Sequence, residues 1–205
     1  MTPIEVPFLI GQDGWCSALP HPPCTNFDAR PDNTEISLLV IHNISLPPGE
    51  FGSGYIEALF ANTLDYDAHP YFDQLRGLRV SSHFLIRRDG SALQFVSTLN
   101  RAWHAGVSEF KGRQRCNDFS IGIELEGSDH EAFCDAQYQT LAVLTYSLAL
   151  RHPLTDVIGH QHIAPDRKTD PGPFFDWRRF SAEFSAHAGS ELSRTKSPVL
   201  LRFPD

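Results

Sequence analysis

Continuous apolar runs and alternating apolar and polar positions predict the strands of this chain. Residues 35–41 contain the unbroken run SLLVI, which is typical of a strand covered on both faces and therefore central in its sheet. Residues 119–126 alternate instead, with isoleucines and a leucine on one face and a glycine and two glutamates on the other. Since successive side chains of a strand point to opposite faces, the apolar face is expected to lie in the core.

Shorter patterns predict the remaining strands. Residues 82–87 and 92–97 are two apolar stretches separated by Arg-Asp-Gly-Ser, and an Asp-Gly pair between such stretches favours a hairpin. Residues 157–160 form a further short apolar run, which predicts another strand. Proline-rich residues 19–31 and glycine-rich residues 46–54 are predicted to be irregular.

The strongest helix prediction covers residues 135–151. Leu141, Leu144 and Leu148 recur there at helical spacing, Asp135 can cap the start, and Pro153 restricts the residue before it. Residues 55–62 and 177–184 are predicted to form two shorter helices. Strands and helices in this order predict an α/β fold with a central mixed sheet flanked by helices.

The length and composition fit one globular domain. The chain has 205 residues with 41% hydrophobic content, enough to bury an ordinary core. We expect this domain to span residues 1–188 and a flexible polar tail to span residues 189–205. The four cysteines are scattered without the spacing of a zinc motif, so we interpret them as free thiols.

Charge limits the classes of partner. The net charge of −8 argues against a nucleic-acid partner, because phosphate binding needs a basic surface. Residues 76–115 nevertheless carry eight basic and two acidic residues. This local excess suits a small anionic substrate, or it is balanced by acids elsewhere in the fold.

The first residues and the apolar runs bear on localisation. The amino-terminal stretch lacks a basic region followed by a long apolar segment, so we expect no secretory signal. No run approaches the about 20 apolar residues that a membrane span needs. These features predict a cytoplasmic protein without a membrane partner, and no obligate protein partner is evident.

The segment GHQHIAPDRKTDPG at residues 159–172 carries the densest candidate chemistry. It combines two histidines, two aspartates and a lysine, and a catalytic zinc takes three such nitrogen or oxygen ligands, leaving one position open. His42 ends the apolar run of the predicted central strand and is the best candidate for the third ligand. From the residues alone, His160 and His162 are also a plausible pair, because alternate residues of a strand face the same way.

Four separated motifs carry a family resemblance. They are SLLVIHNISLPPGEFG at residues 37–52, RAWHAG at 101–106, FSIGIELEG at 119–127, and the segment 159–172. Together, in this order, they resemble the zinc-dependent N-acetylmuramoyl-L-alanine amidases of the AmpD type, which are related in fold to peptidoglycan recognition proteins. The resemblance covers about residues 5–184.

The resemblance implies a ligand set and catalytic residues. It assigns zinc to His42, His160 and Asp170, and leaves His162 with a supporting or surface role. It assigns general acid–base catalysis to Glu124, and it gives Lys168 the role of stabilising an oxyanion. Zinc would lower the pKa of a coordinated water toward about 7, and no organic cofactor is needed.

The resemblance also implies a substrate. The bond would join N-acetylmuramic acid, in its 1,6-anhydro form, to the L-alanine of a stem peptide, as in cytoplasmic peptidoglycan recycling. The positions that resemble the family's substrate pocket are Asn43, Arg79, Trp103, His104 and Arg115. The arginines suit stem-peptide carboxylates because the guanidinium forms two-pronged hydrogen bonds. Trp103 and His104 fit a core position equally well.

Other functions remain open at this point. A non-catalytic peptidoglycan-binding module shares the fold, although all three ligand positions are filled here. An amidase of intact cell wall would need an export signal. A structural zinc protein would need a closed four-ligand site and would tolerate loss of Glu124.

Overall fold

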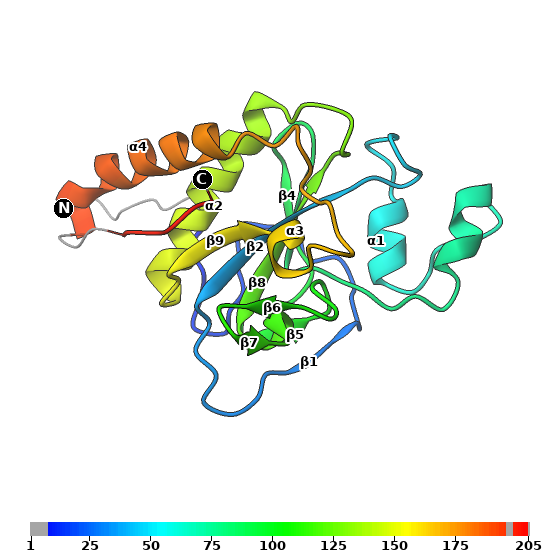
Figure 1. The fold of residues 1–205 in the computed structure, drawn as a ribbon, viewed down its shortest axis with the longest axis horizontal. Helices are drawn as coiled ribbons and strands as arrows, with labels where there is room; N and C mark the ends of the chain where they lie inside the picture. The colour runs from blue at the N-terminus through cyan, green and yellow to red at the C-terminus, as the bar shows by residue number, and fades with distance from the viewer. Residues whose placement is uncertain (1–7, 196–198, 205) are drawn as a thin grey trace.

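A five-stranded mixed sheet forms the centre of the protein in a computed structural model that describes residues 8–195 and 199–204 (Figure 1). Its strand order is β4-β3-β8-β2-β9. The strands are β2 (Leu38–Ile44), β3 (Phe84–Ile86), β4 (Ala92–Gln94), β8 (Ser120–Glu126) and β9 (Asp156–Gly159). All pairs are parallel except β3 and β4, which form the predicted hairpin. The α/β fold with a mixed sheet is therefore confirmed.

Strand β2 lies between β8 and β9, as its unbroken apolar run predicts. Its residues alternate between two cores. Leu39 and Ile41 belong to the core on one face of the sheet, while Leu38 and Val40 belong to the core on the other. His42 follows on the same face as Leu38 and Val40, since side chains alternate with a period of two.

Two long helices cover one face of the sheet (Figure 1). They are α2 (Asp135–Arg151), which has the predicted bounds, and α4 (Trp177–Thr195). Leu141, Leu144 and Leu148 of α2 pack in this core with Phe180 and Phe184 of α4. The expected cap at Asp135 is wrong: the N–H of Cys134 donates to Gln137 at 3.0 Å, and the Asp135 carboxylate pairs with Arg179 at 2.7 Å.

Helix α4 runs past residue 188, where a tail was expected. The His187 ring packs edge-on against Tyr146 of α2, with centroids 5.1 Å apart, and Ala188 packs on the same core. Beyond the helix, Val199, Leu201 and Phe203 also lie against this core. These contacts explain why the helix continues beyond residue 188. The stretch is polar on average, but one of its faces packs against α2. Residues 196–198 and 205 of the predicted tail lie outside the described residues.

Short elements cover the other face of the sheet. They are β1 (Phe27–Ala29), β5 (Asn100–Ala102), β6 (Glu109–Phe110), β7 (Arg113–Gln114), the 3-10 turn η2 (Cys116–Asp118) and α3 (His160–Ile163). Helix α1 (Tyr55–Phe60) and the 3-10 helix η1 (Pro70–Leu75) form a separate lobe to the right in Figure 1. An apolar cluster that includes Phe60 and Phe72 packs this lobe against Leu85 of β3 and Phe95.

Both faces of β8 are buried, not one as its alternation predicts. Ile121, Ile123 and Leu125 face α2 and α4, but Glu124 and Glu126 are only 8% and 1% exposed. Glu126 accepts a hydrogen bond from the N–H of Gly52 at 2.6 Å. Loops therefore cover the polar face of this strand, and its two glutamates are buried.

An additional strand, the state of the cysteines and the character of the helices also bear on the predictions from sequence. Residues 19–31, predicted to be irregular, contain β1, which pairs with β5. The four cysteines are free, as expected. Among the described residues, no helix has the length and apolar character needed to span a membrane.

Candidate active site

The carboxyl ends of three parallel strands bring the main candidate residues together. His42 lies near the end of β2 and is paired in register with Glu124 of β8. His160 directly follows β9, which pairs with the opposite side of β2. Parallel strands end at the same edge of a sheet, and α/β proteins commonly place their sites there. Residues 118 positions apart in the chain therefore meet at one point.

Asp170 joins His42 and His160 in a compact cluster. Asp170 Oδ2 lies 2.8 Å from His42 Nδ1 and 3.1 Å from His160 Nδ1, and the two Nδ1 atoms are 3.1 Å apart. Within the described part of the chain, this is the group of His, Cys, Asp or Glu side chains suited to hold a metal ion. Tetrahedral zinc with ligands at about 2.0–2.1 Å would separate them by about 3.3 Å, close to the spacing seen.

The loop between His160 and Asp170 is closed at its base. The Gln161 N–H donates to the Asp170 carbonyl at 2.9 Å. Asn43 donates to the Pro171 carbonyl at 3.1 Å and to Asp129 at 2.7 Å. A side chain at Gly159 would place its Cβ 2.5 Å from Pro171 Cδ. The glycine and the amide thus allow the end of the loop to pack against the end of β9.

The hydrogen bond of His160 Nε2 determines which ring nitrogen has its lone pair directed at Asp170. His160 Nε2 lies 3.0 Å from the Ala105 carbonyl, which can only accept, so Nε2 carries the proton. In the neutral ring, Nδ1 is then an acceptor facing the acceptor Oδ2 of Asp170. Two acceptors at 3.1 Å repel each other unless a cation lies between them. The donor set therefore fits a divalent metal.

Glu124 is a buried carboxylate beside this cluster. Burial raises its pKa well above the ordinary value, the charge of Asp170 raises it further, and Lys168 opposes both. Its Oε2 atom has no hydrogen-bond partner. An unpartnered buried carboxylate with a raised pKa is the expected state of a group that exchanges protons with a ligand.

Gly122 leaves no open space beside Glu124, because the His104 ring lies over it. A Cβ at Gly122 would meet the His104 ring at 2.6 Å, so the imidazole fills that space. His104 Nδ1 lies 2.9 Å from His42 Nε2, and His104 Nε2 lies 3.2 Å from Ser120 Oγ. Both ring nitrogens of His104 therefore form hydrogen bonds within the protein.

A cleft of about 390 Å³ opens over the cluster. Its lining includes the cluster itself, Glu124 and Lys168, and of the predicted substrate positions it includes Asn43, Trp103 and His104. Arg79 is exposed and lies between two lining residues, Leu78 and Val80. Arg115 lines a neighbouring depression instead.

The basic stretch 76–115 is largely balanced by acids outside it. Ion pairs involve Arg76, Arg87, Arg88, Arg101, Lys111 and Arg115. In the described residues, Arg79 and Arg113 form no such pair. The structure thus favours internal charge balance over a broad anion-binding surface, and it leaves Arg79 available to an anionic group.

His162 is not part of the cluster of His42, His160 and Asp170. Its Nδ1 accepts the N–H of Gly159 at 2.9 Å, and its ring packs against Trp177 with centroids 5.7 Å apart. His162 lies in the short helix α3, and alternate residues of a helix do not share a face. The strand-based pairing with His160 fails for that reason.

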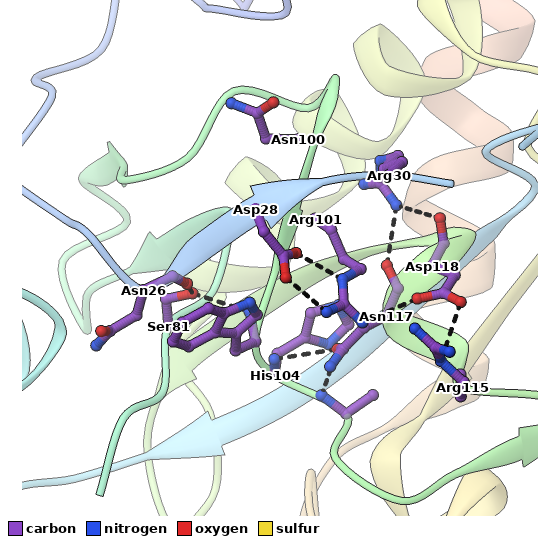
Figure 2. A network of polar contacts seen from close by, with 12 residues as sticks. Asn26, Asp28, Arg30, Ser81, Asn100, Arg101, His104, Arg115, Asn117 and Asp118 are labelled. Carbon is purple, nitrogen blue, oxygen red and sulfur yellow. Dashed lines mark hydrogen bonds and ion pairs between the residues drawn. The ribbon is translucent and has the colours of Figure 1, made fainter. Parts of the chain in front are cut away.

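A network of polar contacts holds the loop that carries His104 (Figure 2). Asn117 Oδ1 accepts the backbone N–H groups of His104 and Ala105 at 3.1 and 2.8 Å. Arg101 joins Asp28 and Asp118 in the same network. Sequence reasoning did not single out Asn117 or Ser120, because neither residue type carries a distinctive motif.

Comparison with known proteins identifies the family of this chain. Residues 32–173 match the family model for N-acetylmuramoyl-L-alanine amidase. The 1,6-anhydro-N-acetylmuramyl-L-alanine amidase AmpD of Citrobacter freundii is 55% identical over 187 residues, which cover 90% of this chain and 100% of that protein.

Solved structures show the same fold. A crystal structure of a selenomethionine derivative of AmpD has a TM-score of 0.80 at 57% identity and covers 83% of this chain and 97% of its own. The Escherichia coli amidase AmiD, in complex with anhydro-N-acetylmuramic acid-L-Ala-D-gamma-Glu-L-Lys, has a TM-score of 0.55 at 28% identity, covering 80% and 66%. These similarities confirm the expected amidase-like fold.

Proposed function

The chain belongs to the N-acetylmuramoyl-L-alanine amidase family, and on that premise we propose that it hydrolyses the amide between 1,6-anhydro-N-acetylmuramic acid and the L-alanine of a stem peptide. The names of its relatives support this substrate, since the AmpD of Citrobacter freundii matches over its full length. The AmiD complex with an anhydro-muramyl peptide supports a small muropeptide as the ligand.

One observation carries the chemical part of the proposal. His42, His160 and Asp170 converge with ligand atoms 2.8 to 3.1 Å apart, and Glu124 stands in register with His42 on the next strand. Two imidazoles and one carboxylate are a common ligand set for catalytic zinc with an open fourth position. We therefore infer that these three residues hold zinc.

The roles of the protein groups follow from their surroundings. Zinc in this cluster would supply Lewis-acid chemistry by lowering the pKa of water and polarising a carbonyl. Glu124 takes a proton from the attacking water and returns it to the departing amine, a task suited to a raised pKa. Lys168 offers a positive charge to the oxygen that becomes negative during the reaction.

Substrate contacts are assigned along the cleft. Trp103 lies in the cleft wall and offers an aromatic surface to the sugar. Asn43 borders the same space while it holds the loop at Pro171. We propose that Arg79 and Arg115, at two separate rims, take carboxylates of the stem peptide through charge-assisted hydrogen bonds.

The cellular setting is proposed from the same relatives. A soluble anhydro-muropeptide is a turnover product of the wall, so its hydrolysis belongs to peptidoglycan recycling. We propose that this occurs in the cytoplasm. The relative from Citrobacter freundii is named for the 1,6-anhydro form of the sugar, which supports the recycling step.

The test compares two substrates. Purified protein is incubated with 1,6-anhydro-N-acetylmuramyl tripeptide and, separately, with intact sacculi, and released peptide is followed by mass spectrometry. We expect cleavage of the soluble substrate, little release from sacculi, loss of activity after chelation and recovery with zinc. Preference for sacculi would indicate a wall amidase, while binding without cleavage would indicate a recognition module. Either result would overturn the proposal.

A further inference from the structure

Three residues of β8 stand in a row on the face that carries the candidate site. Ser120, Gly122 and Glu124 alternate along the strand, so their side-chain positions share one face. His42 stands opposite Glu124. The His104 ring lies over Gly122, with one nitrogen toward Ser120 and the other toward His42. A chain of hydrogen bonds therefore runs from Ser120 to His42.

The direction of this chain is fixed at its far end. Ser120 Oγ lies 2.6 Å from the Cys116 carbonyl oxygen, and two oxygens approach this closely only when a proton lies between them. The carbonyl can only accept, so the Ser120 hydroxyl donates its single proton there. Toward His104, Ser120 is left with lone pairs alone.

The proton positions on His104 and His42 follow from this direction. His104 Nε2 lies 3.2 Å from a Ser120 oxygen that now accepts, so His104 carries its proton on Nε2. A neutral imidazole that carries its proton on Nε2 has a lone pair on Nδ1. His104 Nδ1 is then an acceptor, and His42 Nε2, at 2.9 Å, donates to it.

His42 is thereby left with a free lone pair on Nδ1, the atom that faces His160 and Asp170. Reversing every bond would place a proton on His42 Nδ1, between the metal ligands, and would remove the donor to the Cys116 carbonyl. We propose that Ser120 and His104 are positioning residues, which set the His42 tautomer so that Nδ1 binds the metal. This inference rests on the proposed zinc site.

His104 acts as a hydrogen-bond acceptor for His42 and not as a substrate ligand, and Ser120 acts only through His104. Ser120 is buried, with 0% exposure, so no substrate contact can explain an effect of its removal. Groups behind metal-binding histidines typically change metal affinity about 10- to 100-fold when they are lost.

Zinc affinity in the purified protein provides the test. The dissociation constant of zinc is measured by competition with a fluorescent chelator for the wild type, Ser120→Ala and Ser147→Ala. Ser147 is a matched control, because its buried hydroxyl donates to the Val143 carbonyl at 3.1 Å on α2. We expect Ser120→Ala to weaken zinc binding about 10- to 100-fold and Ser147→Ala to leave it unchanged. Equal affinity in all three proteins would overturn the proposal.

A second pair of variants covers the case in which Ser120→Ala does not fold. His104→Asn keeps an oxygen that can accept from His42, whereas His104→Leu has a similar volume and no acceptor. We expect zinc affinity to be retained in the first and reduced in the second. Equal zinc affinity in both variants would contradict the proposed role of His104.

The proton positions can also be observed directly. Long-range proton–nitrogen NMR correlations on the zinc-loaded wild type report which nitrogen of each imidazole carries hydrogen. We expect Nε2–H on both His42 and His104. A proton on His104 Nδ1 would overturn the inference while leaving the zinc site intact. A wild-type protein that binds no zinc would instead overturn the proposed function itself.

Discussion

His42 and Glu124 face each other on neighbouring parallel strands, paired in register at the carboxyl edge of the sheet. This pairing places an imidazole of the proposed metal site and the carboxylate proposed as the base on one rigid support. Side chains held by paired strands keep their separation better than those on loops. The relation between the proposed metal site and the proposed base is thus set by the core of the fold, while Lys168 and Asp170 lie on the loop 159–172.

The first prediction concerns Glu124. Replacement by glutamine keeps the shape of the side chain and removes the basic oxygen, so kcat should fall about 10²- to 10⁴-fold. Zinc content and thermal stability should stay near those of the wild type, because Glu124 is not one of the three clustered residues proposed as ligands. Full activity in a zinc-loaded Glu124→Gln protein would point to a different base.

The sequence predicted the scaffold well because its strongest patterns are local. The apolar run of β2 and the leucine spacing of α2 each report burial directly. The limits of α4 were missed because the helix continues through a polar stretch. There, one partly buried histidine, His187, packs on α2, and that contact has no local signature.

The site was predictable only in part. His42 and the loop 159–172 stand out by residue type, and the family resemblance supplied the choice of Asp170 over His162. The contacts of His104 could not be foreseen, because they depend on the register between β2 and β8 and on the space above Gly122. Strand register and the space above Gly122 depend on contacts between residues far apart in the chain, and these contacts cannot be inferred from composition.

Gly122 provides the second prediction. An alanine Cβ would lie 2.6 Å from the His104 ring, and overpacking of this kind typically costs about 1–3 kcal/mol of unfolding free energy. The ring must shift, so zinc affinity should fall as well. Gly54→Ala is the control, since its Cβ meets nothing within 4 Å. Denaturant unfolding of both variants measures the difference.

The third prediction concerns the acid limb of the pH–rate profile. Lys168 lowers the pKa of Glu124, against the raising effects of burial and Asp170. In Lys168→Ala the pKa of Glu124 therefore rises, and the base loses its proton only at higher pH. The acid limb of kcat/KM should move to higher pH, alongside a fall in kcat.

Lys111→Ala is the matched control for this profile. The Lys111 ammonium pairs with Asp156 at 2.8 Å, and Lys111 is not among the charges that shift Glu124. Its acid limb should coincide with that of the wild type. An unchanged limb in Lys168→Ala would show that Lys168 does not act on the charge of Glu124.

The fourth prediction tests a substrate contact at the rim. If Arg115 binds a stem-peptide carboxylate, Arg115→Ala should raise KM for the anhydro-muramyl tripeptide about 10-fold or more, with a smaller change in kcat. Arg113→Ala is the comparison, because that guanidinium lies over the Phe119 ring at 3.7 Å. An unchanged KM in Arg115→Ala would remove Arg115 from the binding site.

The fifth prediction concerns stability at low pH, away from the proposed metal site. His152 is 5% exposed and its Nε2 lies 2.9 Å from Thr98 Oγ1. Burial, and then the charges of Arg151 and Arg30, lower its pKa to about 4. Between about pH 6.5 and 4 the unfolded chain therefore binds a proton that the folded protein does not.

The sign of the effect follows from linkage. Stability is complete above the unfolded pKa of about 6.5 and falls as the pH drops toward 4, by at most about 1.4 kcal/mol per pH unit from this one group. In His152→Gln the titrating ring is gone, so the unfolding free energy should depend less steeply on pH in that window. Denaturant unfolding from pH 4 to 8 measures both slopes, and equal slopes would mean that His152 is not held neutral in the folded protein.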